Sequence, residues 1–224
     1  MNRLAIFDCD GTLADGQANI CRAMAQCFAD AGLPEPDPLA VRRIVGLSLI
    51  PAIATLLPQA APADHAALAD AYKRTFFALR SDGALDAEPL YEGIAEAIAA
   101  LDADGWLLGV ATGKSDRGLL RVLDHHGLRH HFVTLQTADR HPSKPHPSML
   151  ETAMAEAGAA PETTVMIGDT SFDMQMAAAA GAHALGVAWG YHPPEELMAA
   201  GAAQVVDHAR QIPPGLAQLI KGVR

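Results

Sequence analysis

Short apolar runs alternate with helical stretches along most of this sequence, and this alternation limits the possible folds more than any other feature. Apolar segments typical of buried strands lie at 4–7, 106–112, 132–137, 164–169 and 182–189. Apolar residues at helical spacing lie between them at 92–104, 116–126, 148–158 and 171–180. Such alternation produces a mostly parallel sheet covered by helices on both faces. The sequence therefore predicts an α/β fold, completed by two amphipathic segments at the end of the chain.

One long interval breaks this alternation. Between Ala14 and about Ala87, helical spacing covers 16–30, 38–47, 48–57 and 62–81, and no strand candidate is present. Ordinary crossovers between neighbouring strands are much shorter than this interval. We therefore predict an all-helical domain at 15–87, inserted into a core made of 1–14 and 88–224.

The composition of the chain argues against several kinds of binding partner and against a membrane-spanning protein. The chain has 224 residues, with 16 basic against 26 acidic side chains and a net charge of −10. This balance argues against nucleic acid or an anionic membrane as a partner. No apolar run approaches the roughly 18 residues of a membrane span, and no signal-peptide pattern opens the chain. The three cysteines lack metal-ligand spacing, which suits a reducing compartment. We expect a soluble, cytoplasmic protein.

Polar residues follow the predicted strands where each strand ends. Asp8 and Asp10 follow the first strand, Thr112 ends the second, Lys144 lies beyond the third, and Asp169 ends the fourth. The carboxyl ends of parallel strands share one edge of the sheet, where open α/β sheets bind their ligands. Any one of these residues alone is compatible with an ordinary turn or a solvated loop. Together they predict a single polar cleft.

The acids of this cleft suit a divalent cation and the chemistry of phosphorus. Asp8 and Asp169, with a carbonyl from the turn and water, form a ligand set that Mg²⁺ prefers. Asp173 falls in the following helical turn, where it can contact the metal through water or orient Lys144. A carboxylate can also attack phosphorus directly, and a second acid such as Asp10 then protonates the leaving oxygen and activates water.

The remaining polar groups of the cleft suit a phosphoryl group. The hydroxyl of Thr112, the turn at Gly113, and the amides around Gly11 and Thr12 can donate hydrogen bonds to its oxygens. Lys144 adds a compact positive charge.

In order and spacing, these residues resemble the motifs of the haloacid dehalogenase-like hydrolase superfamily. The motifs are Asp8-x-Asp10-Gly11-Thr12, Thr112, Lys144 and Gly168-Asp169-x-x-x-Asp173. The resemblance covers nearly the whole chain, because the predicted helical insert lies where that family carries its helical cap. It implies a Rossmann-like core under a cap that governs substrate choice.

The resemblance also implies a role for each motif residue. Asp8 matches the nucleophile and a metal ligand, and Asp10 matches the general acid/base, whose carbonyl also binds the metal. Thr112 and Lys144 match the phosphoryl-binding positions, Asp169 matches a metal ligand, and Asp173 its supporting acid. Because dehalogenases and phosphonate-cleaving members lack the second aspartate, Asp10 points to hydrolysis of a phosphate ester.

The expected function is that of a Mg²⁺-dependent phosphatase acting on a small phosphorylated metabolite, similar to phosphoglycolate phosphatases. A sugar-phosphate mutase resembling β-phosphoglucomutase would share the same core residues, and a catalytically idle binding protein on this scaffold is an alternative of another class. We expect a monomer or a homodimer.

Several further residues have open roles. Lys114 is a candidate substrate contact, and Arg42 or Arg43 in the insert can bind a second anionic group or lie on a solvated helix face. Cys9 is expected to pack into the core. The histidines at 125, 126, 130, 131, 141 and 146 lack ligand spacing and are expected at the surface.

Overall fold

The computed structural model describes residues 2–220 and contains one six-stranded parallel sheet within them. The strand order is β3-β2-β1-β4-β5-β6. The strands are β1 (Asn2–Phe7), β2 (Leu107–Thr112), β3 (Phe132–Thr137), β4 (Ala159–Gly168), β5 (His183–Val187) and β6 (Gln204–Val206). The predicted α/β fold is confirmed.

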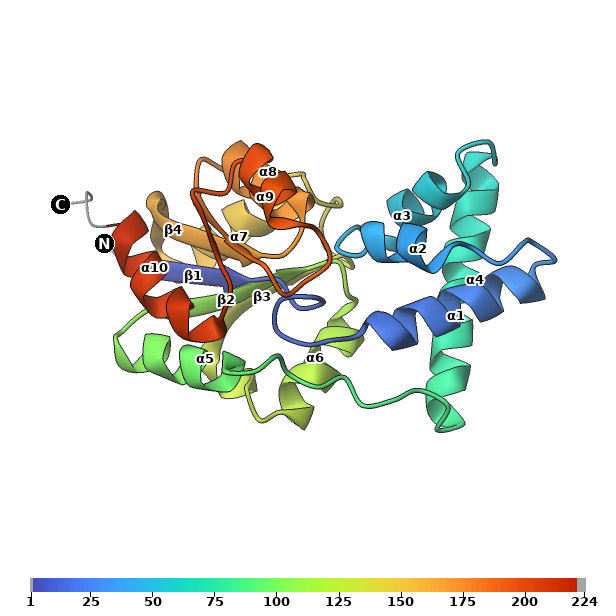
Figure 1. Ribbon diagram of the computed structural model, residues 1–224, viewed down its shortest axis with the longest axis horizontal. Helices are drawn as coiled ribbons and strands as arrows, with labels where there is room; N and C mark the ends of the chain where they lie inside the picture. Colours follow the sequence, from blue (N-terminus) through green and yellow to red (C-terminus); the bar gives the residue numbers. More distant parts are fainter. Residues whose placement is uncertain (1, 221–224) are drawn as a thin grey trace.

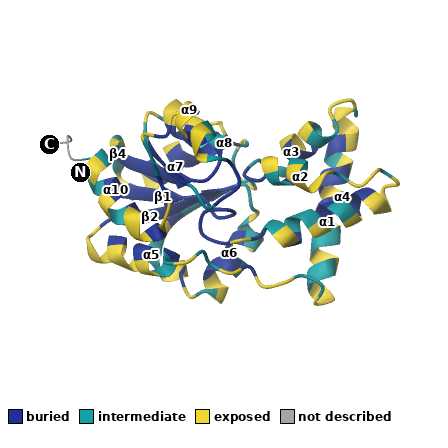
Figure 2. Ribbon diagram, viewed as in Figure 1, coloured by how far each residue is buried: buried dark blue, intermediate teal, exposed yellow. Residues whose placement is uncertain are grey.

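Helices cover both faces of this sheet (Figure 1). One face packs against α5 (Ile94–Ala103), α6 (Asp116–His125) and α10 (Ile212–Leu219), and the other against α7 (Ser148–Ala157), α8 (Ser171–Ala179) and α9 (Pro194–Ala199). Successive strand residues point to opposite faces, so Ala5 and Phe7 join the first hydrophobic cluster while Leu4 and Ile6 join the second. In Figure 2 the sheet is accordingly buried, and the helices expose only their outer surfaces.

The strand order fixes where polar loops converge. From β1 the sheet grows through β2 and β3 on one side and through β4, β5 and β6 on the other. The loops that leave β1 and β4 therefore diverge, which opens a crevice at the carboxyl ends of these two strands. The register pairs Phe7 with Ile167, so the residues that follow both strands lie side by side.

Four of the five helices between β1 and β2 form a separate layer beyond this edge (Figure 1). They are α1 (Gln17–Asp30), α2 (Pro38–Arg43), α3 (Leu49–Leu56) and α4 (Pro62–Ser81). Their apolar faces build a third hydrophobic cluster, drawn from residues 20–79 alone and centred on Met24, Phe28, Ile53 and Leu68. We call this four-helix layer the cap.

The two chain segments that connect the cap to the sheet run side by side. The amide of Asp15 donates to the carbonyl of Pro89, and the side chain of Asn19 makes two hydrogen bonds of 3.0 Å to the backbone of Asp86. Pairing of the segments in this way gives the cap a narrow double connection to the core.

Three details differ from the sequence predictions. The strand predicted over 164–169 is longer, because β4 begins at Ala159. The strand β6 was predicted only as part of an amphipathic segment, because three residues are too few to display a strand period. The helix predicted over 38–47 ends at Arg43, and the chain then turns through Gly46, whose φ of 101° is incompatible with a helix.

Candidate active site

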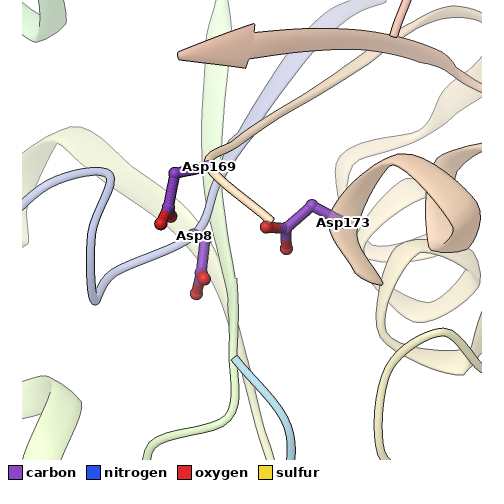
Figure 3. A group of neighbouring side chains, drawn as sticks. All are labelled: Asp8, Asp169 and Asp173. Atoms are coloured by element: carbon purple, nitrogen blue, oxygen red, sulfur yellow. The ribbon is translucent and has the colours of Figure 1, made fainter. Parts of the chain in front are cut away.

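Three aspartates meet at the crevice between β1 and β4 (Figure 3). Asp8 directly follows β1, Asp169 directly follows β4, and Asp173 lies in the first turn of α8. One carboxylate oxygen from each lies within 4.8 Å of the other two, and all three residues are buried. The topology thus brings together acids separated by more than 150 residues in the sequence.

Lys144 joins this cluster from the loop before α7. Its ammonium lies 2.6 Å from Asp173 Oδ1 and 3.0 Å from Asp8 Oδ1, and its side chain is fully buried. Burial lowers the pKa of Lys144, but the charges of Asp173 and Asp8 outweigh this effect and raise it above its usual range. Lys144 therefore carries a fixed positive charge between the two acids.

The second oxygen of Asp173 is held by its own helix. Asp173 Oδ2 accepts hydrogen bonds from the Thr170 amide at 3.0 Å and the Thr170 hydroxyl at 2.7 Å, which forms a capping box at the start of α8. A Cβ on Gly168 would lie only 2.4 Å from the Asp173 side chain, so glycine is needed for this close approach.

Asp169 is held from two sides. Its Oδ1 accepts from the Thr12 hydroxyl at 2.7 Å, and its Oδ2 accepts from the Tyr191 amide at 2.9 Å. A Cβ on Gly11 or on Gly190 would lie 2.1 Å from an Asp169 side-chain atom. The loops around both glycines therefore close onto this carboxylate and fix its orientation.

The aspartate cluster carries more negative charge than its neighbours neutralise. Three carboxylates face one ammonium, and Asp8 Oδ2 is a buried oxygen without a hydrogen-bond partner. Burial raises the pKa of Asp8 to about 7; Lys144 acts against this shift, while Asp173 and Asp10 add to it. Burial and the neighbouring acids also raise the pKa of Asp169. Such a set fits a hard divalent cation, because carboxylate oxygens are its preferred ligands.

Asp10 belongs to a second ionic group beside the first. The Lys114 ammonium lies 2.9 Å from Asp10 Oδ1 and 3.2 Å from Glu88 Oε2, while Glu88 Oε1 lies 2.5 Å from Arg80 of α4. Burial raises the pKa of Asp10, although Lys114 opposes this effect. This group contains two acids and two bases, so it is balanced without a metal ion. It also joins the cap to the core through Glu88.

A pocket of about 560 Å³ opens from these acids toward the cap. Asp8, Asp10, Thr112, Gly113 and Lys114 line its polar end. The Thr112 hydroxyl accepts from the Lys114 amide at 3.2 Å. The opposite wall is largely apolar and comes from the cap. The pocket thus combines a polar floor with an apolar roof.

The arginines predicted as candidate substrate contacts do not line this pocket. Arg42 donates to the carbonyl of Gly190 at 2.6 Å and stacks over the Tyr191 ring. Arg43 makes hydrogen bonds of 2.9 and 2.7 Å with the exposed Glu196. Both side chains therefore bind the cap to the loop and helix after β5. Their direction depends on how the cap docks, which helix periodicity does not reveal.

The remaining predicted residues lie as follows. The Thr12 hydroxyl binds Asp169, Cys9 is buried in a hydrophobic cluster as expected, and none of the six clustered histidines is fully buried. Within 2–220, the aspartate triad is the single group of His, Cys, Asp or Glu side chains arranged to hold a metal ion.

Three contributors to the site were missed by sequence reasoning: Arg80, Glu88 and the amide of Tyr191. Glu88 is an acid beside Pro89 at the point where the chain returns to the core, and that position was the one available signal. Arg80 and Tyr191 act through long-range contacts that no local pattern indicates.

Known proteins resemble this chain over nearly its whole length. A family model described as "Haloacid dehalogenase-like hydrolase" matches residues 5–187. The "Probable phosphatase IndB" of Dickeya dadantii is 36% identical, with 99% of this chain and 96% of that protein aligned. A phosphoglycolate phosphatase of Pseudomonas putida is 30% identical, covering 99% of this chain and 82% of that protein.

A solved structure also resembles the chain. The crystal structure of CbbY from Rhodobacter sphaeroides in complex with phosphate has a TM-score of 0.78 and 27% identity, and covers 95% of this chain and 96% of its own. Separately, no helix within 2–220 is long and apolar enough to cross a membrane.

Proposed function

Because this chain belongs to the haloacid dehalogenase-like hydrolase family, we propose that it is a Mg²⁺-dependent phosphatase that hydrolyses a small phosphate monoester. The observation that carries this proposal is the pair of buried acids Asp8 and Asp10 at the floor of one pocket. Asp8 has an unpaired carboxylate oxygen, and Asp10 has a raised pKa. We also propose residues 15–87 as the cap and 1–14 with 88–224 as the catalytic core.

In the first step, a carboxylate oxygen of Asp8 forms a bond to phosphorus while the bond from phosphorus to the ester oxygen breaks. The leaving oxygen takes a proton from Asp10, the second acid at the floor of the pocket. The product alcohol departs, and the phosphoryl group remains on Asp8 as an acyl phosphate.

In the second step, Asp10 removes a proton from water, which attacks phosphorus and breaks the bond to Asp8. Inorganic phosphate leaves, and both acids return to their starting states. Lys144 and the backbone around Gly11 and Gly113 supply positive charge and donors to the phosphoryl oxygens. Lys144 is suited to this role because Asp8 and Asp173 hold it in place on both sides.

Asp8, Asp169 and the carbonyl of Asp10 would hold the Mg²⁺ ion, and Asp173 would support them. When bound, the ion would neutralise part of the negative charge of the cluster and of the phosphoryl group. The excess of carboxylates over ammonium groups supports this assignment.

The test is release of inorganic phosphate from p-nitrophenyl phosphate by the purified protein. We expect turnover with Mg²⁺, its loss in EDTA, and its return when excess Mg²⁺ is added. Asp8→Asn should lower kcat by at least about a thousandfold while the circular dichroism spectrum is retained. Turnover unchanged by EDTA would contradict the metal assignment, and substantial residual kcat in Asp8→Asn would contradict its role as nucleophile.

A further inference from the structure

We propose that the part of the pocket bordered by α6 is an anion subsite built by Arg117 and Arg121. The substrate would then be a phosphate monoester whose leaving group carries a second anionic group beyond an apolar segment. This inference rests on the proposed phosphatase function and specifies the class of its substrate.

Both guanidinium groups border the same pocket as the catalytic acids. Arg117 and Arg121 are four residues apart on α6, so they lie on one face of the helix, and both line the pocket. The Arg117 guanidinium lies 4.6 Å from the ring centroid of Phe77 in α4 of the cap. The subsite therefore lies where the cap meets the core.

The acids around these two arginines have other partners. Glu88 pairs with Arg80 and Lys114, and Asp70 pairs with Lys73 at 3.6 Å. Asp139 accepts from the amide of Asp116, whose own carboxylate pairs with Arg140.

Within the described chain, neither Arg117 nor Arg121 forms a salt bridge. Partial burial and the charges of Arg80 and Arg117 lower the pKa of Arg121, while the charge of Glu88, which already pairs with Arg80 and Lys114, acts in the opposite direction. In a chain with a net charge of −10, two neighbouring guanidinium groups thus border the pocket without a salt-bridge partner within the described residues. An anionic ligand would relieve their mutual repulsion.

Apolar side chains of the cap line the same pocket. They include Met24, Ile44, Tyr72 and Phe76. A pocket with a proposed phosphoryl site at its floor, apolar cap side chains on its wall and two arginines at its rim favours a phosphate ester whose leaving group carries a second anion beyond a hydrocarbon or ring. The two parallel N–H donors of a guanidinium group match the oxygens of a carboxylate and of a phosphate. The second anion is therefore one of these two.

The experiment compares substrates that differ only at their far end. An ω-carboxyalkyl phosphate, the matching ω-carboxamide and the matching alkanediol bisphosphate are assayed with Mg²⁺ over a series of linker lengths. We expect kcat/KM for the carboxylate or the bisphosphate to exceed that of the carboxamide by at least about tenfold at one length. Whichever of the carboxylate and the bisphosphate has the higher kcat/KM identifies the second anion of the substrate.

The same ratio is then measured in variants. In Arg117→Gln/Arg121→Gln it should fall to about one, while Arg117→Lys/Arg121→Lys should retain part of it. Arg129→Gln, at an exposed position outside the pocket, is the matched control and should keep the full ratio. Because the readout is a ratio between substrates within one protein, a general loss of activity does not mimic the effect.

Two results would overturn the subsite. One is a wild-type ratio near one at every linker length, and the other is a ratio that persists in the double glutamine variant. In both cases hydrolysis of the carboxamide would leave the phosphatase function standing. Absence of turnover with every ester would instead contradict the phosphatase function itself.

Discussion

At the scale of single residues, the difference between buried and exposed ion pairs can be measured directly. Glu88 is buried and holds both Lys114 and Arg80, so Glu88→Gln leaves two cations with Asp10 as their one acid. We expect the free energy of unfolding to fall by about 2–3 kcal/mol, measured by urea denaturation near neutral pH. Glu196→Gln at the solvent-screened Arg43 pair is the control, with an expected loss much smaller than that of Glu88→Gln. Equal losses would contradict the importance of burial here.

The pH dependence of the Glu88 effect has a definite sign. Burial raises the pKa of Glu88, but Lys114 and Arg80 outweigh it and lower the pKa below its usual 4.5. The unfolded state therefore takes up a proton first as the pH falls. The stabilisation is fully present above the unfolded pKa and is lost as the pH falls through the folded pKa. The difference between wild type and Glu88→Gln should accordingly shrink in acid, and a constant difference would contradict this account.

The site residues differ in how far they can be predicted from the sequence. Asp8, Asp10, Lys144 and Asp169 could be named in advance, because parallel strands that end in polar residues must bring them to one edge. Their hydrogen bonds could not be named. That Thr12 holds Asp169, or that Lys114 links Asp10 to Glu88, depends on loop conformations that tertiary packing decides.

At the scale of secondary structure elements, one close contact joins the cap to the phosphoryl end of the pocket. A Cβ on Gly113, in the turn between β2 and α6, would lie 2.7 Å from the carbonyl oxygen of Leu47 and 2.8 Å from that of Gly46. Gly113→Ala should push the cap outward and lower kcat/KM for p-nitrophenyl phosphate by about tenfold. The narrow connection between cap and core can absorb this shift, so the melting temperature should change little.

The matched control for this variant is Gly215→Ala in α10. Its added Cβ would meet its nearest neighbour at 3.4 Å, an ordinary contact far from the pocket. It should leave kcat/KM unchanged. Full activity in Gly113→Ala would show that the cap does not need this contact in the productive state.

Helices and strands could be predicted where they are long enough to display the regular spacing of their apolar residues. The helices α1, α4 and α5 and the strands β2 and β3 follow their apolar spacing closely. The short strand β6 and the end of α2 were not, because three residues show no period and a turn at positive φ overrides helical spacing. The direction of Arg42 and Arg43 depends on docking of the cap, which local sequence does not encode.

At the scale of the whole molecule, the fold concentrates unneutralised negative charge at one point. The chain carries a net charge of −10, and at the crevice between β1 and β4 three buried carboxylates face one lysine. The adjacent group of Asp10, Glu88, Lys114 and Arg80 is balanced. We therefore expect a divalent cation to bind at the first group and not at the second.

This charge imbalance predicts how Mg²⁺ stabilises the protein as a function of pH. Because the pKa of Asp8 rises from 3.8 to about 7 on folding, the metal-free folded state holds a proton that the unfolded state releases, and its stability falls as the pH rises through this interval. Mg²⁺ replaces that proton and binds the ionised acids. We expect excess Mg²⁺ to raise the melting temperature by about 5 °C or more near pH 8 and by much less near pH 5. Asp8→Asn removes the titrating charge, so this variant should be more stable than wild type in EDTA near pH 8 and should gain less from Mg²⁺. An equal Mg²⁺ effect at both pH values would place the ion away from Asp8.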